Sequence, residues 1–139
     1  METWFRDALQ SRLRDDLERL RRSLDDLERL RARVAQRAIA VLASKGMAAV
    51  CAVGPAGAGP GLGKEVNALR RMLLGGRDKM KRRYRLLCPS DAQAALCDDD
   101  LRRLRFELSE RHDRIVGAEF DQCLKVLDRA ASRCGGWRE

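Results

Sequence analysis

The chain of 139 residues is poor in aromatic side chains, with only three Phe, two Trp and one Tyr, although 45% of its residues are hydrophobic. Aromatic rings supply much of the buried area in thick globular cores. Their scarcity therefore argues against such a core. It favours thin aliphatic seams between helices, in one domain or one elongated helical unit.

Long apolar runs are also absent. No uncharged stretch reaches the roughly 20 residues that a membrane-spanning helix needs. The first ten residues, METWFRDALQ, carry charged groups where a signal peptide requires an apolar segment. From these two absences we expect no membrane span and no secretion. The predicted location is intracellular, in the cytoplasm, the nucleus or both.

Metal-binding patterns are missing as well. Histidine occurs once, as His112, and the cysteines are widely spaced, at Cys51, Cys88, Cys97, Cys123 and Cys134. Zinc sites built from His and Cys take ligands in short pairs, so we predict no metal site. An odd number of cysteines without a close pair favours reduced thiols that pack as small hydrophobes.

Catalytic patterns are equally weak. Ser109 and His112 lie within one helical turn of each other, next to Asp113, but the segment offers no separate orienting group and no anion hole. No pair of carboxylates stands out from the ion-paired surface. We therefore predict no enzymatic activity, no catalytic residue and no cofactor.

A glycine-rich stretch before Lys64 resembles a phosphate-binding loop only in part. Ala58, Gly63 and Lys64 have the relaxed spacing of that motif, but Glu65 stands where a Ser or Thr hydroxyl should hold magnesium. No further strands are predicted from which a parallel sheet could form. Residues 46–63, which carry no charge and end in a Gly/Pro cluster, are therefore predicted to be a hinge.

What the sequence does contain is strong helical patterning. Two similar decapeptides, DDLERLRRSL at 15–24 and DDLERLRARV at 25–34, follow each other directly. Apolar residues recur there at alternating steps of four and three, the heptad spacing of a coiled coil, if Arg31 is allowed at one seam position. The predicted oligomer seam comprises Leu13, Leu17, Leu20, Leu24, Leu27 and Val34.

A long helix over residues 1–45 has no interior of its own. Its leucines can leave water only against other helices, from the same chain or from a second copy, and we expect self-association, most simply as a homodimer. Leu30, Ala35 and Leu42 widen the apolar stripe in the second half of this helix. That half is therefore predicted to face more than one neighbouring helix.

The second half of the chain is also predicted to be helical. Residues 64–88 form a short helix that ends at Gly75 and Gly76, followed by a basic segment. Ser90 begins residues 90–134, as an N-cap with Gln93 in the capping-box position.

The residues from Leu101 onward are predicted to form the second long helix. Asp98, Asp99 and Asp100 suit its N-terminus, because carboxylates stabilise the positive end of a helix. The apolar phase slips between Ile115 and Phe120, so we expect the two halves of this helix to face different neighbours.

These elements predict an all-α protein formed by one elongated domain over residues 1–139. Two long amphipathic helices pair as a coiled-coil-like antiparallel hairpin, with one or two short helices in the connector. Such a hairpin places both chain ends together, with Trp4 near Trp137.

Positive charge is concentrated in one segment. Residues 64–88 carry nine Lys or Arg against two acidic residues, a net charge of +7 out of +8 for the whole chain. Phosphates are the natural complement of such a segment. The predicted nucleic-acid-binding residues are Arg70, Arg71, Arg77, Lys79, Lys81, Arg82, Arg83, Tyr84 and Arg85, and the contact surface can extend over Arg12, Arg19, Arg22, Arg29, Arg33 and Arg37.

The function predicted from these features is that of a helical dimer that binds RNA or DNA through the phosphate backbone, with little sequence specificity. RNA is favoured and a duplex is possible. The alternative is a coiled-coil adaptor or scaffold subunit that recruits another helical protein. A nuclear-import signal and binding to anionic lipid are further interpretations of the same charge.

Overall fold

The computed structural model describes the backbone of residues 2–51 and 61–133, and the side chains of residues 3–40 and 64–129. All regular structure in these residues is helical, which confirms the predicted all-α class. The elements are α1 (Glu2–Cys51), α2 (Gly61–Leu87), α3 (Asp91–Ala94), α4 (Asp99–Arg114), the π-helical turn η2 (Ile115–Glu119) and α5 (Phe120–Arg133). Helix α1 continues past the predicted start of the hinge at residue 46, and residues 52–60 lie outside the described part.

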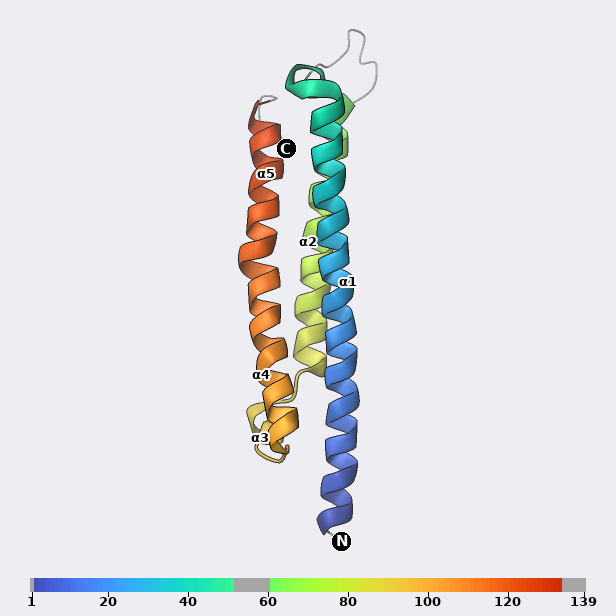
Figure 1. The fold of residues 1–139 in the computed structure, drawn as a ribbon, viewed down its shortest axis with the longest axis vertical. Helices are drawn as coiled ribbons and strands as arrows, with labels where there is room; N and C mark the ends of the chain where they lie inside the picture. The colour runs from blue at the N-terminus through green and yellow to red at the C-terminus, as the bar shows by residue number, and fades with distance from the viewer. Residues whose placement is uncertain (1, 52–60, 134–139) are drawn as a thin grey trace.

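Three long helical segments lie side by side, as Figure 1 shows: α1, α2, and the continuous run of α4, η2 and α5. Helix α2 is antiparallel to α1. Near one end, Arg37 Nη2 donates to Glu65 Oε1 at 2.8 Å, and near the other, Arg83 Nη1 donates to Ser23 Oγ at 2.9 Å.

The third segment runs parallel to α1. Arg111 Nη2 lies 2.6 Å from Asp25 Oδ1, and further along both helices Arg31 Nε lies 3.6 Å from Glu119 Oε2. This arrangement differs from the predicted antiparallel hairpin of two long helices, since α1 begins at the opposite end of the molecule from the end of α5 (Figure 1). Trp137, the predicted neighbour of Trp4, lies outside the described residues.

The physical reason for this difference is that α2 does not stop at its two glycines. It continues through Gly75 and Gly76 to Leu87 and becomes a full third arm of the bundle. A Cβ at Gly76 would lie 2.6 Å from Leu30 Cδ2 and 3.4 Å from Leu27 Cδ1, both on α1. Gly76 thus permits close approach of two helices and does not terminate one.

The predicted leucine seam is buried within a single chain. Its six residues have between 0% and 5% of their surface exposed and belong to one hydrophobic cluster with Val66, Leu73 and Met80 of α2 and with residues of α4, η2 and α5. A second copy is therefore not needed to cover the seam. The widened second half of α1 faces two helices, as predicted, because Leu30 lies against α2 and Ala35 lies beside α5.

Short-range signals set the helix starts in the second half of the chain. Ser90 caps α3 in a capping box: its hydroxyl accepts from the Gln93 amide at 3.2 Å, and the Gln93 side chain accepts from the Ser90 amide at 3.0 Å. Asp98 caps α4 and accepts from the Leu101 amide at 2.9 Å. Both starts were predicted from the sequence.

The slip in apolar phase between Ile115 and Phe120 corresponds to the π-helical turn η2. The amide of Phe120 donates to the carbonyl of Ile115, five residues earlier, which is the spacing of a π-helix. In an α-helix with 3.6 residues per turn, two residues five positions apart point to different faces. In a π-helical turn, whose hydrogen bonds join residues five positions apart, the same two residues point to nearly the same face. Ile115 and Phe120 are consequently both fully buried.

Candidate nucleic-acid interface

The basic segment forms α2, which packs against α1 on one side and against α5 on the other. Its cations therefore point in different directions. The nine residues predicted to bind nucleic acid divide into cations paired with α5, one aromatic residue packed against α4, and cations that remain exposed.

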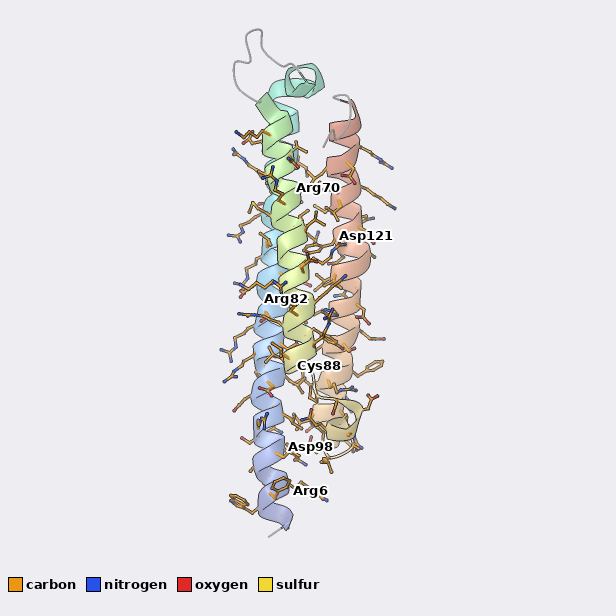
Figure 2. The ribbon with its side chains drawn as sticks, turned by 180° about the vertical axis from the view of Figure 1, so that it is seen from behind. Arg6, Arg70, Arg82, Cys88, Asp98 and Asp121 are labelled. Atoms are coloured by element: carbon orange, nitrogen blue, oxygen red, sulfur yellow. The ribbon has the colours of Figure 1, made fainter. Side chains whose placement is uncertain are left out.

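Two predicted binding residues pair with α5. Arg70 Nε donates to Asp128 Oδ1 at 3.3 Å, and Arg77 Nη1 donates to Asp121 Oδ1 at 3.2 Å. Figure 2 shows Arg70 on the side of α2 that faces α5. Only 20% of the Arg77 side chain is exposed. These two arginines join α2 to α5 through ion pairs, so in this structure they are less available to phosphate than the cations that have no acidic partner.

Tyr84 is also turned inward. Its ring is stacked on His112 of α4, with ring centroids 4.0 Å apart and an interplanar angle of 15°, and its hydroxyl lies 2.7 Å from Ser109 Oγ. Burial is the main cause that raises the pKa of the Tyr84 phenol. A ring held in this way is not available to stack on a nucleic-acid base, and its predicted role is corrected to packing.

The remaining cations of α2 face solvent. Among the predicted binding residues, all of which lie in the described part of the chain, five are exposed and form neither an ion pair nor a side-chain hydrogen bond: Arg71, Lys79, Lys81, Arg82 and Arg85. We call these five residues the exposed α2 cations. Figure 2 shows Arg82 among the side chains that leave α2 on the side away from α5. From Arg71 to Arg85 they extend over about 21 Å at 1.5 Å per residue.

Arginines of α1 lie next to this surface. A hollow of about 220 Å³ is lined by Arg33, Lys79 and Arg83, and a second hollow of about 400 Å³ is lined by Arg19, Arg22 and Arg83. Asp26 borders both hollows, and its carboxylate lies 3.3 Å from Arg29 Nη1. We call the two hollows together the α1–α2 groove.

Some α1 arginines named as an extension of the surface have other partners. Arg37 pairs with Glu65 at 2.8 Å and Arg29 pairs with Asp26 at 3.3 Å, whereas Arg12 is exposed and lines neither hollow. Within α1, Arg19 pairs with Asp16 and Arg21 pairs with Glu18, each three residues away.

Ser23 was not among the predicted binding residues. This residue is 8% exposed, and its hydroxyl accepts from Arg83 Nη1 at 2.9 Å, which holds the Arg83 guanidinium at the point where the two hollows meet. The only signal for this role in the sequence is a small polar residue beside Leu24 of the seam. Such a residue can accept a hydrogen bond from a neighbouring helix.

Ser109 and His112, the residues of the weak catalytic pattern, have different hydrogen-bond partners. Ser109 Oγ lies beside the Tyr84 hydroxyl, while His112 Nδ1 lies 3.0 Å from Asp113 Oδ1, and His112 Nε2 is buried without a hydrogen-bond partner. Burial raises the pKa of the Cys97 and Cys123 thiols, which disfavours reactive thiolates. Among the described residues no three His, Cys, Asp or Glu gather around a possible metal position.

No protein family, curated protein or solved structure matches this chain. In the described part of the chain, no helix combines the length and apolar composition that crossing a membrane requires. A function therefore has to be inferred from the surface of the bundle itself.

Proposed function

We propose that the chain is a non-enzymatic helical protein that binds nucleic acid through the phosphate backbone with little sequence specificity. The observation that carries this proposal is the group of exposed α2 cations, which have no acidic partner among the described side chains. Like charges gathered on one face repel each other and add nothing to the stability of the fold. A polyanion relieves this repulsion.

The chemistry of these side chains suits phosphate. Arg71, Arg82 and Arg85 can each donate two hydrogen bonds to one phosphate group, while Lys79 and Lys81 act as point charges. Contacts to phosphate carry no sequence information, and the counterions that they release make the affinity dependent on salt. One chain presents this surface, so the proposal does not require the predicted homodimer.

The test is a salt series of binding to labelled RNA and DNA, between about 50 and 200 mM salt. We expect the native chain to show a steep negative slope of log affinity against log salt. In the variant with Lys79→Gln, Arg82→Gln and Arg85→Gln, the slope should become shallower by about 2 to 3, because each phosphate contact contributes about 0.9.

The matched control removes three charges elsewhere. Arg103, Lys125 and Arg129 on α4 and α5 are exposed and have no acidic partner among the described residues. The control variant with glutamine at these positions has the same net charge as the α2 variant, and its slope should stay close to that of the native chain. Equal losses in the two variants, or no salt-dependent binding by the native chain, would contradict the proposal.

One observation favours the alternative function, that of an adaptor for another helical protein. A largely apolar groove of about 530 Å³ lies between α1 and α5, with Ile39 and Val126 exposed beside it. Lys125 and Arg129, which have no acidic partner among the described side chains, also line it, so its complement is an acidic amphipathic helix. An adaptor of this kind predicts a flat salt response with nucleic acid in the experiment above.

A further inference from the structure

The α1–α2 groove has cations on both of its sides. Arg19, Arg22 and Arg33 come from α1, and Lys79 and Arg83 come from α2. The acidic residue that lines the groove, Asp26, is paired with Arg29 of the same helix. Arg19 is paired with Asp16 at 3.9 Å, whereas Arg22 and Arg33 of α1 and Lys79 and Arg83 of α2 have no acidic partner among the described side chains. The groove is therefore bordered by positive charge on both sides.

The cations on the two sides are set apart by the packing of the helices. Packed helix axes are about 8–10 Å apart, and the arginine side chains extend outward from them. Along α1, Arg19 and Arg33 are separated by about 21 Å, a length that corresponds to roughly six base pairs at 3.4 Å per step. A single strand offers one row of phosphates, whereas a duplex offers two rows, one on each side of every groove.

Stacking groups are absent from this surface. Among the residues whose side chains the structure describes, no aromatic residue lines either hollow, and Tyr84, the aromatic residue of α2, is stacked on His112. Proteins that bind single strands commonly combine positive charge with aromatic side chains, and each stacked base adds about 1–3 kcal/mol. A single strand on this groove would gain the charge contacts of one row and no stacking.

We infer that the α1–α2 groove binds double-stranded nucleic acid, with the phosphates of one strand contacted from α1 and those of the other strand contacted from α2. This inference rests on the proposed function and adds the class of ligand to it. Arg83 lies at the centre of the contact, because it lines both hollows and its guanidinium is held by Ser23.

The test compares a duplex with a single strand of the same length, as RNA and as DNA. The native chain is expected to bind the duplex about tenfold more tightly than the single strand at equal salt. The variant with Arg22→Gln and Arg33→Gln should lose about tenfold in duplex affinity and much less in single-strand affinity. Both arginines are exposed and lack an acidic partner among the described residues, so the fold should persist, which circular dichroism verifies.

The variant with Lys125→Gln and Arg129→Gln is the matched control, because it removes two exposed charges from α5 and should keep the duplex preference. Equal affinity of the native chain for duplex and single strand, with a steep salt slope, would overturn the duplex inference and leave the proposed function standing. The same holds if the α1 variant loses affinity for both ligands equally. Absence of salt-dependent binding to either ligand would instead overturn the proposed function.

Discussion

A chain that carries Leu24→Asp is expected to unfold at every protein concentration. Leu24 is 0% exposed and belongs to the hydrophobic cluster shared by α1, α2 and the third helical segment. The substitution removes the leucine packing, worth about 2–5 kcal/mol, and places a carboxyl group where no polar partner is available. Burial of an unpartnered polar group costs about 2–7 kcal/mol more, and the combined loss of about 4–12 kcal/mol is comparable with the roughly 5–15 kcal/mol that stabilises a domain.

This result separates a core within one chain from a seam between two copies. In a dimer seam, an aspartate would separate the copies and leave helical monomers, whereas in the intramolecular core it removes the fold itself. Far-UV circular dichroism and sedimentation, measured across a concentration series, distinguish these outcomes. Ile39→Asp is the matched control on the same helix, since Ile39 is 64% exposed and its replacement should change stability by less than about 0.5 kcal/mol. A folded monomeric Leu24→Asp variant would contradict the burial described above.

Phe120→Ala is expected to lower the free energy of unfolding by about 3–5 kcal/mol. Phe120 is fully buried at the point where the π-helical turn passes into α5, and it is among the largest buried side chains of the described core. Removing its ring leaves a cavity between helices that cannot collapse without moving α5. Chemical denaturation followed by circular dichroism measures the loss.

Phe106→Ala provides the comparison for this substitution. Phe106 lies on the same helical segment but is 61% exposed, so its truncation should change stability by less than about 0.5 kcal/mol. Similar losses in the two variants would mean that the π-helical turn does not direct Phe120 into the core.

Features encoded by neighbouring residues could be predicted from the sequence. The capping box of Ser90 and Gln93, the helix start at residues 98–100 and the phase slip before Phe120 each depend on residues a few positions apart, although the cap at Asp98 and the π-helical form of the slip were not predicted. The leucine seam was predicted correctly as a buried face, because its period does not depend on which helix covers it. Which helix covers it depends on distant contacts.

Gly76 shows why the path of the chain was predicted wrongly. Two adjacent glycines in a sequence are typical of a helix C-terminus. The position of Leu30 on α1 shows that Gly76 instead allows α1 and α2 to pack closely. Once α2 continues through the two glycines, it becomes long enough to be a third arm, and the last helical segment must then run parallel to α1.

In the candidate site, the position of the basic segment could be predicted from neighbouring residues, but the partners of its side chains could not. The position of the basic segment was evident from charge alone, but the partners of Arg70 and Arg77 lie 58 and 44 residues away in the sequence. The charge of the segment therefore could not distinguish arginines that pair with α5 from arginines that face solvent. Tyr84 was assigned to the surface for the same reason, since its partner His112 is on another helix.

Lysine footprinting tests most directly whether the exposed α2 cations are the contact surface. Lys79, Lys81 and Lys125 are all exposed and react with an acylating reagent in the free chain, and mass spectrometry measures each one separately. With saturating duplex, we predict that labelling of Lys79, which lines the α1–α2 groove, falls most, that labelling of Lys81 falls less, and that labelling of Lys125 on α5 stays unchanged. Equal protection of all three lysines, or protection of Lys125 alone, would contradict the account.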